Sequence, residues 1–350
     1  MNASPRRPIA LSVVVPAYNE AHRFEDGMGH LMDALARGVP DPETTEIVVV
    51  DDGSTDGTDR RAASLLAALP HHRVIRRATN AGKGAAVRAG VGAARGALIA
   101  FCDADMSIEP AQLVDLVTAL DDAEVAIGSR SLPGSVVDYD NLPRTLMGRA
   151  FNRMVNAATD VALVDTQCGF KGFRAPVARL LFHFSVIDRF AFDVEVLRDA
   201  RRLGLRIAEV PVRWQHVPDS RVRPLRDPLS MLADIARSRT GLRRPPPVPA
   251  VVAGDGAPAQ AAVEVAGVTL PVLRTTGGTT LVLFPLCEAA EFDRAVEHIG
   301  RHGGASDTVR RLLTLDDLEA MAPLTLVAPA GRSTEVPSRA PAPAVEREAS

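Results

Sequence analysis

Two acidic clusters, each placed after an apolar run, are the residues of this sequence best suited to chemistry. Asp51 and Asp52 follow four β-branched residues, and Asp103 and Asp105 follow a second apolar run, 97–102. Such runs are typical of buried parallel strands, and ligands of open α/β sheets bind beyond the carboxyl ends of these strands. Neighbouring carboxylates repel each other when both are ionised. The pattern therefore predicts a site where a divalent cation and a nucleotide diphosphate offset that repulsion.

The spacing of Asp103 and Asp105 favours a metal. Hard oxygen ligands suit Mg²⁺ or Mn²⁺, and these ions take a few carboxylates together with diphosphate oxygens. The alternative interpretation is a polar strand end ahead of a helix that begins near Glu109. For Asp51 and Asp52 the alternative is an ordinary turn and helix cap, whereas the functional interpretation is hydrogen bonding to a base or a ribose.

A glycine-rich segment, 80–84, precedes a predicted helix. Glycines permit close approach of the backbone, and a helix N-terminus favours anions, so the segment suits a phosphate. It is not a P-loop, because Arg77 and Gly84 stand where that motif needs glycine and then serine or threonine. Taken alone, Lys83 is more simply explained as a solvated side chain.

Further polar residues stand beside apolar ones. Pro16, Tyr18 and Glu20 follow the first strand-like run, either as loop residues over the sheet edge or as a strand end and helix start. Asp193 and Glu195 lie among large apolar residues, where unpaired charges are rare. The structural alternative is that Asp193 caps backbone amides and that Glu195 pairs with a nearby arginine, Arg189 or Arg198.

Composition and charge exclude several classes of protein. The 350 residues suffice for two domains, and the net charge of −3 gives no general attraction to nucleic acid. Three cysteines without CxxC spacing favour a reducing compartment and argue against a zinc site. No apolar run approaches the ~18 residues that cross a bilayer, and residues 1–8 lack a signal-peptide pattern. We expect a cytoplasmic protein, with peripheral contact to the inner face of the membrane as an option.

Strand-like and helix-like segments alternate from residue 9 to about residue 240, which predicts an α/β fold with a mostly parallel sheet and helices on both faces. The predicted strands are 9–16, 45–50, 72–76, 97–102, 124–128 and 207–214. The predicted helices are 20–37, 56–69, 84–94, 109–119, 141–159, 187–203 and 225–240.

The C-terminal third has a different composition. Proline, alanine and glycine between 245 and 260 predict a linker. Two strand-like runs around Gly277, followed by helical stretches at 288–300 and 307–320, predict a small α+β domain. The expected divisions are a tail (1–8), the main α/β domain (9–244), the linker (245–260), the small α+β domain (261–326) and a disordered tail (327–350).

Seven motifs, in order through residues 11–223, resemble those of the inverting family-2 glycosyltransferases, which have the Rossmann-like GT-A fold. VVVPAYNE, VVVDDGSTDGT, NAGKG and DADM are those of the superfamily. DTQCGFKGF, RFAFDVEVL and VPVRWQHVPDSRV are more specific, and resemble the dolichyl-phosphate β-glucosyltransferases and bacterial polyprenyl-phosphate glycosyltransferases. The chain departs from that group in lacking a membrane helix, and residues 261–326 match nothing in it.

The resemblance, together with the residues above, implies a role for each matched position. The expected metal ligands are Asp103 and Asp105, and Ser107 replaces a glutamine that ligates the metal in mannosyl relatives. The expected nucleotide-sugar residues are Pro16, Tyr18, Glu20, Asp51, Asp52, Lys83, Asp103, Gln167 and Glu195. The expected catalytic residues on the sugar and acceptor side are Arg130, Asp165, Lys171 and Asp193.

These features predict transfer of a hexose, glucose from UDP-glucose, to a polyprenyl phosphate with inversion. A bound metal would neutralise charge on the departing UDP. The acceptor phosphate, whose second pKa is ~6, is largely dianionic at neutral pH and requires no general base. Arg130, Lys171 or Arg174 would hold it. A hydroxyl acceptor would need a base, and Asp165 and Asp193 are the candidates.

Several alternatives remain open from the sequence. GDP-mannose or another nucleotide sugar could be the donor, and a soluble hydroxyl the acceptor. Asp103-Ala104-Asp105 also resembles the nucleophile loop of haloacid-dehalogenase-type phosphatases, although three predicted strands precede it. The segments 141–159 and 225–244 have apolar faces with arginines nearby, as interfacial membrane helices do, or pack on the domain in the ordinary way.

Overall fold

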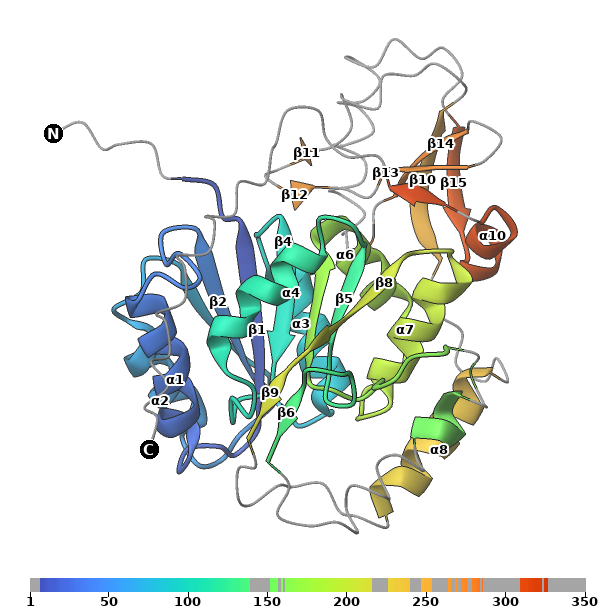
Figure 1. Ribbon diagram of the computed structural model, residues 1–350. Coiled ribbons are helices and arrows are strands. Elements are labelled where there is room, and N and C mark those ends of the chain that lie inside the picture. Colours follow the sequence, from blue (N-terminus) through green and yellow to red (C-terminus); the bar gives the residue numbers. More distant parts are fainter. Residues whose placement is uncertain are drawn as a thin grey trace, which may run out of the picture.

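The computed structural model describes residues 7–138, 152–156, 159, 161–215, 226–239 and 247–253, and, nearer the C-terminus, 264–265, 268–269, 272–275, 279–283, 285, 309–322 and 324–326. Its centre is a seven-stranded sheet with helices on both faces, and a smaller sheet lies against one end of it (Figure 1).

The larger sheet contains β1 (Leu11–Ala17), β2 (Thr45–Asp51), β3 (His72–Arg76), β4 (Leu98–Cys102), β5 (Val125–Ser129), β7 (Phe170–Arg174) and β8 (Ile207–Pro211). Two short strands, β6 (Val136–Val137) and β9 (Arg213–Trp214), pair with each other. The helices around the sheet are α1 (Phe24–Ala36), α2 (Thr58–Leu66), α3 (Lys83–Ala93), α4 (Leu113–Ala119), which follows the 3-10 turn η1 (Pro110–Gln112), α6 (Ala175–Phe184), α7 (Phe192–Arg202) and α8 (Arg226–Arg239).

Strand order places the predicted acidic clusters on either side of β1. The order is β3-β2-β1-β4-β7-β5-β8, and every neighbouring pair is parallel except those that β7 makes with β4 and β5. The predicted mostly parallel sheet is therefore confirmed. Because β2 and β4 both flank β1, Asp51 at the end of β2 and Asp103 just beyond β4 emerge at the same edge of the sheet.

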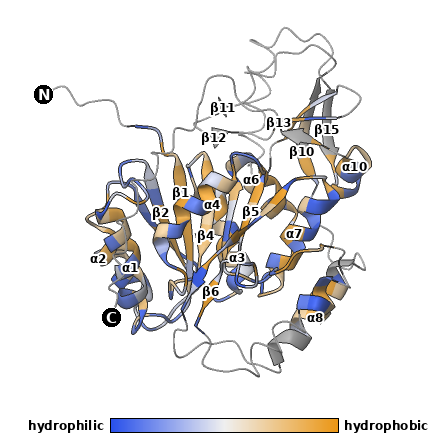
Figure 2. Ribbon diagram, in the orientation of Figure 1, coloured by the Kyte–Doolittle hydropathy of each residue, from blue (hydrophilic) through white to orange (hydrophobic). Residues whose placement is uncertain are grey.

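Alternation along each strand divides the core between the two faces. Val13 and Val15 pack with α1, α2 and α4, whereas Val14, between them, packs with α3, α6 and α7. This is the period of two that a strand imposes on its side chains. Because both faces are covered, the central strands β1 and β4 are mostly apolar, as the hydropathy colouring shows (Figure 2). The continuous apolar runs in the sequence arise from this burial.

A second, antiparallel sheet follows in the C-terminal part, with the order β15-β10-β14-β13-β16. Its elements are β10 (Val248–Ala253), β13 (Val272–Arg274), β14 (Thr280–Leu283), β15 (Val309–Leu313) and β16 (Thr325–Leu326), with α10 (Leu315–Ala320) at its side and a separate hairpin of β11 (Glu264–Val265) and β12 (Val268–Thr269). The sheet contacts the end of α7, where Leu324 N donates to Leu203 O at 3.3 Å and Arg202 pairs with Asp316 at 2.8 Å.

Several boundary predictions are wrong in this region. The predicted linker contains β10, which is paired on both edges, and 309–313, predicted as helix, is β15. Neither segment reveals its state locally, because its partners come from distant parts of the chain. The predicted helix 288–300, the C-terminal tail, residues 1–6 of the N-terminal tail and most of 141–159 lie outside the described residues. Residues 152–156 are helical. None of the helices in the described part of the chain is long and apolar enough to span a bilayer.

Candidate active site

The loops that follow β1 and β2 are bonded to each other at successive positions. This ties the segment carrying Tyr18 and Glu20 to the segment carrying Asp51 and Asp52, so the two motifs form one surface. Pro16 is half-buried near the end of β1, and Tyr18 beyond it is 38% exposed. The bonds run from Asn19 N to Ser54 Oγ (2.8 Å), from Glu20 N to Thr58 Oγ1 (2.9 Å) and from Ala21 N to Asp56 Oδ2 (3.0 Å).

Asp51 presents a buried oxygen that has no hydrogen bond among the described residues. The side chain is 0% exposed, and its Oδ1 accepts from Ser54 N at 3.1 Å. Oδ2 accepts no hydrogen bond, and the Arg76 guanidinium is 3.8 Å from it. An unsatisfied buried acceptor costs about 1–3 kcal/mol. The position therefore suits a ligand that brings an N–H or O–H group.

Asp52 shapes the glycine-rich loop. Its Oδ2 accepts from Gly82 N at 2.7 Å and from Ala81 N at 3.2 Å, and Arg77 lies 3.1 Å from Oδ1. Gly82 has φ +119°, and a Cβ there would lie 2.4 Å from the carbonyl oxygen of Asp188. Only glycine fits this close approach, so the loop before α3 is fixed by Asp52 on one side and by the 187–189 segment on the other.

Lys83 and the second acidic cluster form an ionic group. Lys83 Nζ is 2.5 Å from Asp103 Oδ1, and the lysine side chain is only 18% exposed, so the simple interpretation of a solvated lysine is wrong. Burial alone would lower the pKa of Lys83, but the charges of Asp103 and Asp193 outweigh it and raise that pKa. Lys83 thus stays cationic beside the glycine-rich loop, where an anion would lie.

Asp105 lies beside a second carboxylate, that of Asp103. Burial and then the charge of Asp103 raise its pKa, against the hydrogen bonds from Ser107, whose hydroxyl donates to Asp105 at 2.8 Å. Two hard-oxygen side chains that repel each other at a sheet edge fit a divalent cation. Among the described residues no three His, Cys, Asp or Glu side chains form a metal group.

Lys171 is placed differently from the expectation. It stands in β7, is 0% exposed, and its Nζ contacts Asp193 Oδ1 at 2.9 Å and the Cys168 carbonyl at 2.6 Å. It therefore cannot hold an acceptor phosphate directly, and that prediction is wrong. The same prediction for Arg174 is wrong because β7 runs antiparallel to β4, which places Arg174 opposite Leu98 at the other end of the sheet.

Asp193 does not cap backbone amides, as the structural alternative proposed. It lies in the first turn of α7, and its partner is Lys171 rather than backbone amides. Burial raises the pKa of Asp193, although Lys171 and Lys83 oppose the rise. The side chain therefore joins the two lysines of the site.

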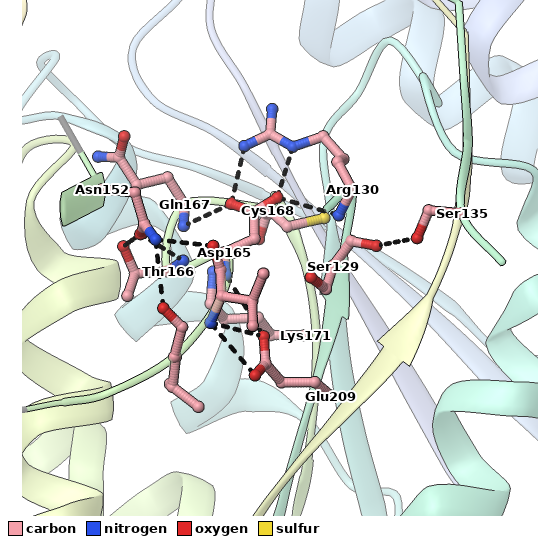
Figure 3. Close-up of polar contacts among 12 residues, drawn as sticks. Ser129, Arg130, Ser135, Asn152, Asp165, Thr166, Gln167, Cys168, Lys171 and Glu209 are labelled. Atoms are coloured by element: carbon pink, nitrogen blue, oxygen red, sulfur yellow. Dashed lines mark hydrogen bonds and ion pairs between the residues drawn. The ribbon is translucent and has the colours of Figure 1, made fainter. Parts of the chain in front are cut away.

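Arg130 and Asp165 face each other as a bidentate pair (Figure 3). Arg130 Nε lies 2.7 Å from Asp165 Oδ2 and Nη2 2.9 Å from Oδ1, while the backbone N–H of Arg130 also donates to Oδ2. Burial would raise the pKa of Asp165, but Arg130 outweighs burial and lowers it. A carboxylate with a lowered pKa is a weak base, so Asp193 is the stronger of the two base candidates.

Glu195 and Gln167 contact the protein itself. Glu195 accepts from Ser185 Oγ at 2.8 Å and from the N–H groups of Val186 and Ile187 at 3.0 Å, so it fixes the segment that packs on the glycine-rich loop. Its pKa is raised by burial and then by Asp199. Gln167 lies beside Met231 of α8, with Nε2 3.6 Å from Sδ.

Glu209 and Asn152 are site residues that sequence reasoning missed. Glu209 accepts from Val164 N at 3.0 Å, and Asn152 accepts from Thr166 N at 3.1 Å and donates to Val164 O at 2.7 Å (Figure 3). Both therefore hold the loop that carries Asp165. Glu209 could have been found as a charged residue within the otherwise apolar strand β8. Nothing in the sequence marks Asn152, because asparagine in a helix is not unusual.

An open, mostly parallel sheet whose acidic loops, glycine-rich loop and buried lysines meet at one edge is the arrangement of a nucleotide-sugar-dependent transferase. A family model for glycosyl transferase family 2 matches residues 12–182. A dolichyl-phosphate β-glucosyltransferase of Dictyostelium discoideum is 33% identical over 251 residues, which cover 68% of this chain and 76% of that protein. One of Drosophila melanogaster is 36% identical over 240 residues, covering 65% and 73%.

The chain belongs to glycosyl transferase family 2. Among solved structures, glucosyl-3-phosphoglycerate synthase from Mycobacterium tuberculosis, in complex with Mn²⁺, UDP and glucosyl-3-phosphoglycerate, has a TM-score of 0.50 at 20% identity, over 79% of this chain and 88% of that one. This likeness concerns the fold, and it confirms the predicted GT-A architecture. The protein is a glycosyltransferase, which removes the phosphatase alternative.

Proposed function

We propose that the protein transfers glucose from UDP-glucose to a polyprenyl phosphate, with inversion, in a reaction that depends on Mg²⁺ or Mn²⁺. The observation that carries this proposal is the juxtaposition of Asp51, with its unsatisfied buried oxygen, and the Lys83–Asp103–Asp105 group on either side of β1. The first suits an N–H or O–H of the uridine, and the second suits a diphosphate with a cation. The names of the relatives support glucose and a dolichyl-type phosphate.

The donor would lie along the carboxyl edge of β1, β2 and β4. The uridine would lie over Pro16, Tyr18 and Glu20, with Asp51 accepting its hydrogen bond. Asp103 and Asp105 would hold the metal, which when bound supplies positive charge to the leaving diphosphate. Lys83, kept cationic by its carboxylate neighbours, would add a second positive charge there.

The acceptor phosphate would bind at Arg130. A phosphate oxygen forms a bond to the anomeric carbon while the bond from that carbon to the UDP oxygen breaks, and the bonding electrons leave with UDP. Attack from the opposite face inverts the configuration. The acceptor monoester is already largely dianionic at neutral pH, so no proton must be removed. Lys171 and Asp193 would then support the sugar pocket from beneath rather than exchange protons.

Binding of a lipid acceptor implies contact with a membrane surface, and we include peripheral attachment in the proposal. Of the two segments expected to provide it, α8 and residues 152–156 and 159 belong to the described part of the chain. The side chains of Met231 and Ile235 on α8 are buried, so the apolar stripe of this helix packs on the protein at these positions. Any surface of α8 that faces a membrane would therefore be a different face of this helix.

The test is transfer of radiolabel from UDP-glucose, UDP-N-acetylglucosamine or GDP-mannose to a polyprenyl phosphate in detergent micelles with Mn²⁺. We expect labelled lipid only from UDP-glucose, with a β-linked product. Asp51→Asn should raise KM for UDP-glucose about tenfold, the effect of one lost hydrogen bond to a charged group. Asp115→Asn, an exposed aspartate on α4, is the matched control and should change nothing. Label from GDP-mannose alone, or from no donor, contradicts the proposal.

A further inference from the structure

The loop 163–166 has no regular secondary structure, yet side chains from two separate elements hold its backbone. From β8, Glu209 Oε1 accepts from Val164 N at 3.0 Å and from Asp165 N at 3.3 Å. From the helix at 152–156, Asn152 Oδ1 accepts from the N–H and the hydroxyl of Thr166, at 3.1 and 2.8 Å. The loop is therefore fixed by two elements that are far apart in the sequence.

Asn156, one helical turn after Asn152, strengthens the same attachment. Its Nδ2 donates to Leu163 O at 2.7 Å, and Leu163 N donates back to its Oδ1 at 3.3 Å. Residues four apart lie on one face of a helix, so the two asparagines present their amides to one loop. Every backbone N–H from 163 to 166 is thus bound by a side chain of Asn152, Asn156 or Glu209.

What this arrangement positions is the carboxylate of Asp165. Both of its oxygens bind Arg130, in a bidentate geometry that fixes the plane of the guanidinium as well as its place. The Arg130 side chain is nevertheless 28% exposed. A guanidinium that is fixed in plane and still accessible is suited to receive an anion, because little side-chain entropy is lost when the anion binds.

We infer that Glu209 and Asn152 are positioning residues for the acceptor phosphate: they act on Arg130 through the loop 163–166 and Asp165, and touch neither substrate. This inference rests on the proposed role of Arg130. Loss of Glu209 leaves the N–H groups of Val164 and Asp165 without their acceptor, the loop shifts, and Arg130 loses its fixed plane. The donor residues on β1, β2 and β4 make none of these contacts. Asp165 Oδ1 also accepts from Gln167 N at 3.2 Å, so we expect the larger effect on the acceptor.

A matched control exists on the neighbouring strand. Glu124, just before β5, also accepts a backbone N–H, that of Arg206 at 2.9 Å, and also pairs with a guanidinium, Arg206 Nη2 at 2.7 Å. It lies at the amino ends of β5 and β8, away from the site. Glu124→Ala therefore removes a similar set of bonds from the same strand pair without touching the loop 163–166.

The experiment measures both KM values with UDP-glucose and a short, water-soluble prenyl phosphate. Glu209→Ala should raise KM for the prenyl phosphate about tenfold and leave KM for UDP-glucose within about twofold. Glu209→Gln keeps the oxygen that accepts from Val164 and Asp165, and should restore acceptor KM to within about threefold of the parent. Glu124→Ala should change neither KM. Equal rises in both KM values, or the same acceptor effect from Glu124→Ala, would show a general structural role and overturn the inference.

A second measurement does not depend on turnover. Phenylglyoxal modifies accessible guanidinium groups, and mass spectrometry of the peptide that carries Arg130 gives its rate of modification. Glu209→Ala and Asn152→Ala should each raise that rate several-fold, and Glu124→Ala should not. An unchanged rate in Glu209→Ala overturns the inference even if the enzyme transfers glucose as proposed. A raised rate in a protein that uses another acceptor supports the coupling of Glu209 to Arg130 and contradicts only the proposed acceptor.

Discussion

Replacing Lys171 with methionine tests the buried ion pair beneath the site. Lys171 contacts the Asp193 carboxylate at 2.9 Å and the Cys168 carbonyl at 2.6 Å, lies over the Phe101 ring at 5.5 Å, and is fully buried. Removing one member of a buried pair leaves an uncompensated charge, at a cost of about 3–5 kcal/mol. Whole domains are stable by only about 5–15 kcal/mol. We therefore expect Lys171→Met to remove a large part of the free energy of unfolding at pH 7.

The dependence on pH identifies the cause. Burial already raises the pKa of Asp193, and Lys171 opposes that rise, so the variant should raise it further. The folded variant then binds a proton that the unfolded chain releases, and its stability falls as pH increases between the unfolded pKa and the raised folded pKa. Conversely, the cost of Lys171→Met should shrink as the pH falls and Asp193 takes up a proton.

Urea unfolding, followed by the fluorescence of the single tryptophan, Trp214, and by circular dichroism, measures the change. The double variant Lys171→Met, Asp193→Leu replaces the pair with apolar side chains and should recover most of the loss, because neither charge of the pair stays buried. A loss below about 1 kcal/mol at pH 7, or a double variant no more stable than the single one, would refute the assignment of the loss to an unpaired carboxylate.

Three further outcomes are expected. Gly169→Ala places a Cβ 2.1 Å from Asp103 Oδ2 and should lower kcat at least about tenfold in the transfer assay. Gly29→Ala, where a Cβ meets no atom within 4 Å, should keep full activity and gain about 0.5–1 kcal/mol in free energy of unfolding. Equal activities of the two variants would contradict the first expectation. Dialysis against a chelator should stop transfer and added Mn²⁺ should restore it, and transfer that persists without metal would contradict the metal proposal. Burial would raise the pKa of Glu124, but Arg206 outweighs burial and lowers it. The stability that this carboxylate contributes is therefore present above its unfolded pKa and lost as the pH falls. Glu124→Gln should flatten the acid side of a profile of unfolding free energy against pH, and an unchanged profile would contradict this.

The apolar runs and turn residues were sufficient to predict the donor half of the fold. β1, β2 and β4 are covered on both faces, so each is a continuous apolar run that ends at its functional residue. The alternation of strand and helix then predicts a parallel sheet, and the edge at which Asp51 and Asp103 meet follows from it. In this half, the apolar pattern of each strand matches its buried place in the sheet.

The acceptor half was less predictable because its strands depend on distant partners. β7 contains Lys171 and Arg174 among phenylalanines, and a lysine inside a buried strand becomes possible only through Asp193, which lies in a later helix. For the same reason the sequence suggested that Lys171 reaches the substrate. β10 follows three prolines and has a linker-like composition, and only pairing with β14 and β15 makes it a strand.

The reversed direction of β7 has a consequence for the order of assembly. β5 and β8 join the other four strands only through this one segment, which is synthesised after all of them except β8. Until Phe170–Arg174 has been inserted, the growing chain exposes an unpaired edge along β4, which could pair wrongly with other strands. The donor-binding half can therefore pair before β7 is made, whereas β5 and β8 join this sheet only after β7, which carries the Lys171 charge into the interior, has been inserted.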